Sequence, residues 1–188
     1  MPTTTPAPDV ASDEVVKVAL ADIQFLCEQR LSGVRSSALN EAELREFERR
    51  LPAYFDAILT RGPAVIDGLL SLLPSLESSA EICGVVIVLL ESRDPRAAAG
   101  IIAALEKNQE PPKLRGFQLA LRRGPMDALL PPLQKWLLGS DPRLAAIAAE
   151  ALAYHRCITP KLPELNKLLS APDPLLRQTA WRALALAQ

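Results

Sequence analysis

Short helical segments that return at a near-constant spacing are the feature that most constrains the fold of this chain. The stretch Ser140–Arg156 opens with Asp141-Pro142 and then places apolar residues at i, i+4, i+7, i+8 and i+11. These spacings form one stripe of an α-helix. The same arrangement returns after Asp173-Pro174, 32 residues further on. An apolar stripe that recurs at a fixed period predicts a helical repeat protein.

The period can be followed through the last two-thirds of the chain. The first apolar residues of four expected helices are separated by 32, 30 and 32 residues: Ile82, Leu114, Leu144 and Leu176. Four prolines are expected to open the alternating helices, since proline costs no hydrogen bond in a first turn: Pro63, Pro95, Pro125 and Pro160. The sequence therefore predicts four helix pairs, over residues 62–93, 94–124, 125–158 and 159–188.

The first third of the chain predicts a lead and two capping helices. Residues 1–11 have the composition of a disordered lead, and residues 12–61 are expected to cover one end of the repeats. The first helix is expected over 13–31 with Ser12 as N-cap. Asn40 and Glu43 have the spacing of a capping box that opens the second helix. Pro52 falls inside this second helix and is expected to kink or split it.

Composition supports an all-α fold. Hydrophobic residues make up 49% of the 188 residues but aromatic residues only 4%, so Leu and Ala dominate, as in closely packed helices. The run Val85–Val88 is the one candidate strand, and it lies inside a longer helical pattern. The fold class predicted is a right-handed α-solenoid of about four helix pairs with two N-terminal capping helices.

Charge and hydropathy narrow the classes of partner. The chain has 21 basic and 22 acidic residues, a balance that argues against nucleic-acid binding. No apolar run reaches the roughly 18 residues of a membrane span, and residues 1–14 lack the regions of a secretory signal. We expect a cytoplasmic protein without membrane insertion. Its cysteines, Cys27, Cys83 and Cys157, lie in apolar helical patterns and are expected to be buried free thiols.

At these motifs the chain resembles HEAT repeats, in particular the short form seen in phycobilisome-lyase-like proteins. That form carries D-P-x-x-R and then A-x-x-A-L on its second helix. Asp173-Pro174-Leu175-Leu176-Arg177 matches it, with Ala180, Ala183 and Leu184 following. Asp141-Pro142 keeps the start, but Ala145 stands in the later Arg position. The resemblance covers roughly residues 62–188.

The N-terminal third resembles the opening of a proteobacterial HEAT-repeat family without an assigned function. The residues that carry this resemblance are 25–30 (FLCEQR), 44–51 (LREFERRL) and 54–58 (YFDAI). Members of that family often appear near type VI secretion genes. The resemblance implies a possible accessory role in such a secretion system.

Sequence motifs for catalysis or metal binding are absent. The chain has a single histidine, His155, and no Gly-rich phosphate loop, GxSxG or HExxH pattern. Cys157 and His155 are two residues apart, so on a helix they would point in different directions. We therefore expect no catalytic residue, no metal site, no cofactor and no enzymatic activity.

Arginines recur on the second helices of the pairs and have two interpretations: Arg115, Arg143, Arg177 and Arg182. In the first, the early Arg of each repeat pairs with an Asp or a carbonyl of a neighbouring turn and forms a ladder. In the second, the arginines line an inner surface that receives an acidic partner segment. Glu150, Tyr154 and Arg156 fall off the apolar stripe and are further candidates for partner binding.

The end near Trp181 stops without a capping repeat, which predicts a contact there with a second copy of the chain or with a missing C-terminal region. The function expected is a non-enzymatic protein-binding scaffold whose partner is not identified by the sequence. One alternative is a lyase-like HEAT protein that holds a small molecule in a cleft near Arg115, Arg122 and His155. A second is sequence-nonspecific DNA binding, which needs a concentrated basic face.

Overall fold

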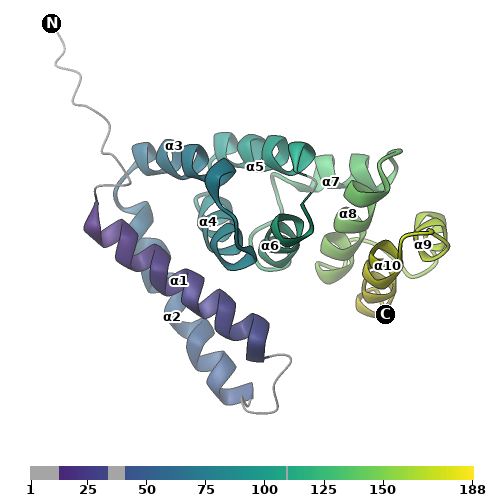
Figure 1. Ribbon diagram of the computed structural model, residues 1–188, viewed down its shortest axis with the longest axis horizontal. Coiled ribbons are helices and arrows are strands. Elements are labelled where there is room, and N and C mark those ends of the chain that lie inside the picture. Colours follow the sequence, from purple (N-terminus) through teal and green to yellow (C-terminus); the bar gives the residue numbers. More distant parts are fainter. Residues whose placement is uncertain (1–12, 34–40, 109) are drawn as a thin grey trace, which may run out of the picture.

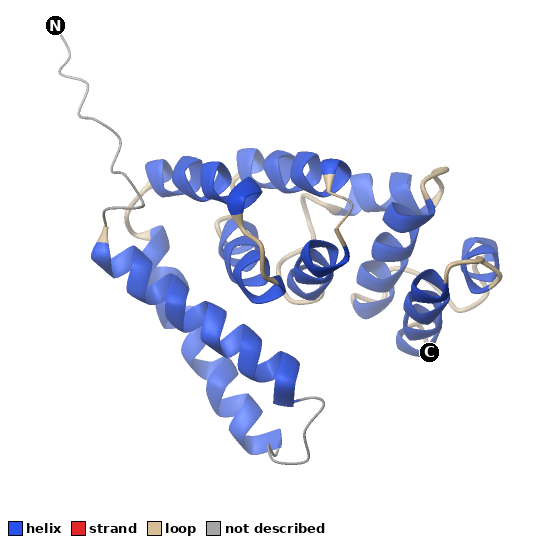
Figure 2. Cartoon of the chain, viewed as in Figure 1, coloured by secondary structure: helices blue, strands red, loops and turns tan. Residues whose placement is uncertain are grey.

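A computed structural model describes residues 13–33, 41–108 and 110–188 of the chain. Within these residues the regular structure is entirely helical, with ten α-helices, one short 3₁₀ helix and no strand, as predicted (Figure 2). The run Val85–Val88 is helical and buried. The predicted disordered lead, the Ser12 cap and the side chains of the Asn40–Glu43 capping box lie outside what is described.

The first two helices form a hairpin at one end of the molecule (Figure 1). Helix α1 spans Glu14–Gly33 and α2 spans Glu41–Leu59. Asp13 caps α1, because its Oδ1 accepts the backbone N–H of Val15 at 3.0 Å. The inner side of α1 also packs against α4 (Ser79–Glu91). The hairpin thus covers the side of α4 that faces away from the later helices.

Pro52 was expected to kink or split the second helix; α2 runs without interruption through it, so the helix is not split. Proline removes only its own N–H from the hydrogen-bond ladder and is tolerated when the affected turn can meet water. Pro52 is exposed, whereas Leu51 beside it is buried. The proline therefore lies on a solvent-accessible side of α2.

Eight further α-helices follow along the chain. Their bounds are Pro63–Leu72 for α3, Ser79–Glu91 for α4, Pro95–Lys107 for α5, Pro111–Leu121 for α6, Leu130–Leu137 for α7, Pro142–Tyr154 for α8, Pro163–Leu169 for α9 and Pro174–Leu186 for α10. The 3₁₀ helix Leu73–Ser75 extends α3. In Figure 1, α4, α6, α8 and α10 follow one another across the molecule, while α3 and α5 lie in a second layer.

Two of the predicted helix starts are wrong. Helices α3 and α5 begin at Pro63 and Pro95 as expected, but α7 begins at Leu130 rather than at Pro125. A helix from Pro125 would place the pair Pro131-Pro132 in its interior, where proline breaks the helix; in the observed α7 this pair lies in the first turn.

The fourth odd helix, α9, begins at Pro163 rather than at Pro160. Its preceding residue, Leu162, is extended with φ −66° and ψ 125°. This conformation follows from Pro163, since proline disfavours the helical region for the residue before it.

Hydrogen bonds between successive pairs join residues about one repeat apart. Ser79 Oγ donates to the Pro112 carbonyl at 2.6 Å, 33 residues away. Trp136 Nε1 donates to Glu106 Oε1 at 3.1 Å, 30 residues away. His155 Nε2 lies 2.9 Å from the Leu121 carbonyl, 34 residues away. These hydrogen bonds join α4 to the start of α6, α5 to α7, and α6 to the end of α8.

Helices α4 and α6 approach very closely at Gly116. A Cβ placed on this glycine would lie 2.8 Å from the Ser79 carbonyl oxygen and 2.7 Å from the Ile82 Cβ. No neighbour could move away cheaply, because one contact is backbone. Phe117, Ala120 and Leu121 form the buried side of α6. The absent side chain at Gly116 therefore sets the spacing between the two helices.

The N-terminal ends of several helices are capped by acidic or hydroxyl side chains. Asp94, Asp141 and Asp173 each precede a proline and accept backbone N–H bonds from the first turn of α5, α8 and α10. Ser78 and Glu81 form a capping box at the start of α4. The Asp-Pro signals in the sequence thus mark true helix starts.

The cysteines do not all match the prediction. Cys27 and Cys83 are buried, but Cys157 is exposed. It lies beyond the end of α8 in a turn, where its Sγ is 3.4 Å from the His155 carbonyl. Its exposure follows from the helix ending at Tyr154, three residues before the thiol.

Gly116→Ala is expected to lower the free energy of unfolding by about 1–3 kcal/mol, because the added methyl group overpacks the α4–α6 contact. Urea unfolding followed by circular dichroism measures this change. Gln118→Ala, on a half-buried position of the same helix, is the matched control and should change stability less. Equal losses in the two variants would contradict the role assigned to Gly116.

The α4 cap predicts an acid-sensitive contribution to stability. Hydrogen bonds from the Ser78 backbone and side chain lower the pKa of Glu81 below its ordinary value. In the unfolded chain a Glu carboxyl has a pKa of about 4.3. Because the pKa of Glu81 is lower in the folded state, its carboxylate stabilises the fold fully above this pH. That contribution is lost as the pH falls through the lower folded-state pKa. Unfolding midpoints measured below about pH 4.3 should therefore fall less steeply in Glu81→Gln than in the parent chain. Parallel pH profiles would refute this assignment.

Candidate binding groove

An open hollow lies between the middle of α2 and the C-terminal ends of α4, α6 and α8. Its volume is about 340 Å³. We call it the α2–α8 groove. It is lined by Leu51, Pro52, Phe55, Ile87, Glu91, Arg122, Arg123, Tyr154 and His155.

Parallel alignment of the even helices brings these helix ends together. At one end, Lys113 in the first turn of α6 pairs with Glu77, which lies just before α4. The Lys113 Nζ is 3.2 Å from the Glu77 Oε1. At the other end, Gly124 after α6 lies against Leu90 of α4. His155 after α8 reaches the last residue of α6. Three C-terminal ends therefore meet at one site, and α2 of the hairpin supplies the opposite side of the groove.

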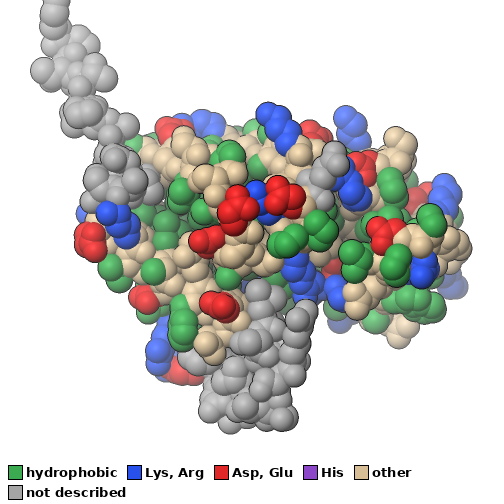
Figure 3. Space-filling model, in the orientation of Figure 1, with side chains coloured by type: hydrophobic (Ala, Val, Ile, Leu, Met, Phe, Trp, Pro, Cys, Tyr) green, Lys and Arg blue, Asp and Glu red, His purple; other side chains and the backbone are tan. Residues whose placement is uncertain are grey.

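The ends of the even helices carry charges that complement the helix dipoles. Acidic residues lie at their N-terminal ends: Glu77, Glu81, Glu110, Asp141 and Asp173. Arginines follow the C-terminal ends of α4, α6 and α8: Arg93, Arg122, Arg123 and Arg156. Both placements are favourable for a helix dipole. In the groove itself, Arg122 and Arg123 lie together with Glu91. The face seen in Figure 3 also shows acidic and basic side chains intermixed.

Two of these arginines adopt a backbone conformation that favours glycine. Arg93 has φ 53° and Arg156 has φ 57°, each just beyond the end of an even helix. A left-handed conformation costs a non-glycine residue on the order of 1 kcal/mol. The Arg156 N–H closes the turn by donating to the Ala153 carbonyl at 3.0 Å. Arginine is thus found where glycine would be less strained.

A buried carboxylate lies behind the groove. Glu150 on α8 is only 1% exposed. It forms an ion pair with Arg122 of the groove, and Arg182 Nη1 of α10 lies 3.9 Å from its Oε1. A buried charge needs such partners to offset its desolvation. Helices α6 and α8 also pack together less extensively than α4 with α6 or α8 with α10, and this ion cluster occupies their junction.

Tyr154 and His155 form the α8 side of the groove. Their rings meet edge to face with centroids 5.5 Å apart. The Leu121 carbonyl can only accept a hydrogen bond, so His155 Nε2 carries a proton and donates to it at 2.9 Å. Tyr154 is 42% exposed. The histidine is held by α6, whereas the tyrosine ring remains accessible.

The structure divides the predicted ladder arginines by their contacts. Arg143 donates to the Asn108 carbonyl of the preceding pair at 2.9 Å and to Asp141 Oδ2 at 2.7 Å. Arg177 donates to the carbonyls of Ala171 and Pro172 at 2.8 and 2.7 Å. These two arginines make the inter-turn bonds of the first interpretation. They lie at the N-terminal ends of α8 and α10, away from the groove.

The remaining predicted residues fall into three places. Glu150 and Arg182 belong to the ion cluster, and Glu150 is buried even though it lies off the repeat stripe. Tyr154 lines the groove and Arg156 follows it. Arg115 is half-buried on α6, about two helical turns before Arg122, and it does not line the groove. Trp181 is 60% exposed on α10.

Several groove residues escaped sequence reasoning. Phe55 reads as a core residue of an amphipathic helix, yet it is half-buried at the groove. Arg122 was considered only for the lyase-like cleft, and Arg123, which directly precedes Gly124-Pro125, was not considered as a site residue. Two adjacent arginines at a helix end next to an aromatic residue of another helix can be recognised only when the two helices are placed together.

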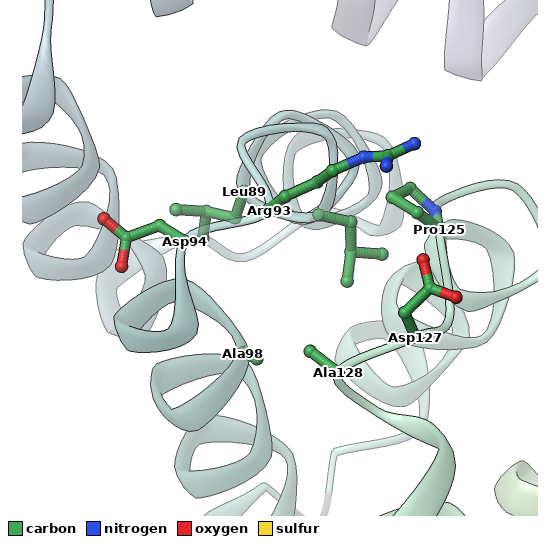
Figure 4. Close-up of a pocket in the computed structure, with 8 residues that line it drawn as sticks. Leu89, Arg93, Asp94, Ala98, Pro125, Asp127 and Ala128 are labelled. Atoms are coloured by element: carbon green, nitrogen blue, oxygen red, sulfur yellow. The ribbon is translucent and has the colours of Figure 1, made fainter.

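A smaller hollow of about 120 Å³ lies on the other side of the α4 end (Figure 4). Ala98 of α5 and Ala128 face each other across it, and the Arg93 side chain extends alongside Pro125. Asp94 points away from Asp127 and is used to cap α5. This hollow is too small and too apolar to suggest chemistry of its own.

Two further properties of the described residues bear on function. They contain no group of three or more His, Cys, Asp or Glu side chains placed to hold a metal ion. No single described helix is long and apolar enough to cross a bilayer; the segments Arg49–Leu59 and Pro63–Ser75 reach that length and apolarity only together, with a 107° bend between them.

Glu150→Ala is expected to lower the free energy of unfolding by about 1–3 kcal/mol, because it leaves Arg122 and Arg182 without their buried counter-charge. This loss is smaller than expected for a fully buried ion pair, because both arginines remain partly exposed to water. The exposed fraction of the side chain is 21% for Arg122 and 35% for Arg182. Urea unfolding measures the loss. Glu14→Ala removes an 81% exposed carboxylate and serves as control. A loss no larger than in this control would contradict the structural role of the cluster.

A scan against protein-family models, a search of curated proteins and a search of solved structures each find no match to this chain.

Proposed function

We propose that the chain is a HEAT-like α-solenoid that scaffolds other proteins and holds a segment of its partner in the α2–α8 groove. The groove is the single observation that carries this proposal. It is open, is assembled from the N-terminal hairpin and three successive helix pairs, and presents both apolar and basic side chains. Such mixed surfaces are typical of protein interfaces, which combine aromatic and arginine anchors.

The solenoid arrangement is supported by the hydrogen bonds that join residues about one repeat apart. Stacked repeats contact only their neighbours and create extended surfaces for partners. The HEAT-like class and an accessory role in type VI secretion rest on the resemblances of the sequence. We infer the scaffold role from the groove itself.

A second candidate function is the binding of a small anionic molecule, as in the lyase-like alternative. Arg122 and His155 do line the same hollow, although Arg115 does not. The groove is bordered by four separate helices and by the exposed Tyr154. An open hollow of this kind is better suited to a polypeptide segment than to a compact molecule, which binds in enclosed pockets.

Site-specific photo-crosslinking tests the scaffold. A photoreactive phenylalanine analogue replaces Tyr154 at the groove, and as a control replaces Ala99, which is exposed on α5. In a lysate of the cells that contain the protein, we expect the same polypeptides to be captured repeatedly from position 154 and not from position 99. Arg123→Glu should reduce that capture, because it reverses a groove charge.

Identical polypeptides captured from both positions, or capture unaffected by Arg123→Glu, would refute partner binding in the groove. Turnover or tight retention of a small anion by the purified protein, with no polypeptide captured, would favour the second candidate function.

A further inference from the structure

We propose that the molecule consists of two bodies that hinge at the junction of α6 and α8, and that this movement opens and closes the α2–α8 groove. The N-terminal body comprises α1 to α6, and the C-terminal body comprises α7 to α10. The arrangement seen in the structure is the closed form. Control of partner binding by the hinge rests on the scaffold function proposed above, whereas the movement itself does not depend on that function.

The packing of the helices defines the two bodies. Within the N-terminal body, α4 packs extensively against both α6 and α1. Within the C-terminal body, α8 packs extensively against both α7 and α10. The contact of α6 with α8 is the main helix contact between the bodies, and it is far less extensive. Separation of the bodies therefore costs less free energy than separation of the helices inside either one.

The size of the side chains explains why this junction is less closely packed. Where α6 meets α4, Gly116 has no side chain, so the two helices approach closely. Toward α8, α6 presents Arg122, which pairs with Glu150. Arg115 and Leu119 lie on the same side of α6 as Arg122 and are half-buried. Long side chains hold helix axes further apart than small ones do.

Polar contacts, rather than close apolar packing, bridge the two bodies. The buried Glu150 carboxylate pairs with Arg122 across the junction. His155 Nε2 donates to the Leu121 carbonyl at 2.9 Å. Two further bridges join Arg143 to the Asn108 carbonyl and Trp136 to Glu106. Each of these contacts can be exchanged for a contact with water, so its net contribution is small compared with that of a packed apolar interface.

The link between the bodies has an irregular backbone and space beside it. It consists of residues 123–129, between α6 and α7. The groove of about 340 Å³ borders the link at Arg123. The hollow of about 120 Å³ borders it at Pro125, Asp127 and Ala128 (Figure 4). Hinges are a few loop residues that absorb changes in backbone dihedral angles, and close-packed interiors leave no such space for movement.

The groove spans the two bodies, so a hinge movement changes its width. Leu51 and Phe55 of α2 and Ile87 of α4 lie on the N-terminal body. Tyr154 and His155 line the groove from the C-terminal body. In the closed form, the bond from His155 to α6 fixes this side of the groove. Rotation about the link moves both rings away from α2 once this bond and the Glu150 ion pair are broken.

Pulsed electron paramagnetic resonance on the full chain measures this movement. One spin label is attached to the exposed native Cys157, which follows α8, and the other to Ala53→Cys, an exposed position of α2 next to the groove residue Pro52. The other two cysteines are buried. The control pair joins Cys157 to Gln178→Cys, exposed on α10 within the C-terminal body. We expect two distance populations between positions 53 and 157, and one narrow population between positions 157 and 178.

Two variants weaken the bridges and should shift the populations. Glu150→Gln removes the buried charge that pairs with Arg122 but keeps the shape of the side chain, and His155→Ala removes the bond to α6. Each should raise the ratio of the longer to the shorter 53–157 distance about two- to tenfold. Glu14→Gln removes an 81% exposed carboxylate from α1 and should leave this ratio unchanged. Unfolding cannot imitate the shift, because it would also broaden the 157–178 distance.

A single narrow 53–157 distance in the parent chain and in both variants would overturn the inference. Equal broadening of the two distances would also overturn it, since that result indicates general loosening rather than a hinge. If position 154 captures a partner but the 53–157 distance does not shift in either variant, the hinge fails while the scaffold proposal stands. If the distance shifts but no polypeptide is captured, the hinge stands and the scaffold proposal fails.

Discussion

The structure depends on the packing of each even helix against the next one. A helix with one apolar side is stable only when that side packs against neighbouring helices. Gly116 shows how closely this packing is set, since even one added methyl group would meet the Ser79 carbonyl. Buried residues on every side of α8 show the same requirement at the centre of the stack. At the start of the stack, the hairpin of α1 and α2 packs against α4 and covers its apolar side.

This packing also explains why the groove lies where it does. Parallel even helices place like ends together, with acidic residues at the starts and arginines after the ends. Each arrangement suits its own helix dipole. The groove forms where the C-terminal ends of α4, α6 and α8 meet the middle of α2, and it contains both basic and acidic side chains.

The junction of α6 and α8 differs from its neighbours. There the packing is less extensive, and Glu150 with two arginines replaces apolar contacts. Buried ion clusters are weak sources of stability compared with apolar packing. A cluster of this kind is therefore better explained by what it holds in place than by stability alone. It holds Arg122, which lines the groove, and so links the packing of the repeats to the proposed recognition of a partner.

The sequence by itself determined the helical class, the spacing of the pairs and most helix starts, because these follow from local rules. Apolar periodicity, Asp-Pro caps and proline at first turns act within a few residues. Where two such rules competed, as at Pro125 against Pro131-Pro132, the sequence alone chose the wrong start. The groove was decided by tertiary structure. Phe55, Ile87, Arg123 and Tyr154 lie far apart in the chain and have unremarkable neighbours. Only the stacking of the even helices and the position of α2 bring them to one surface.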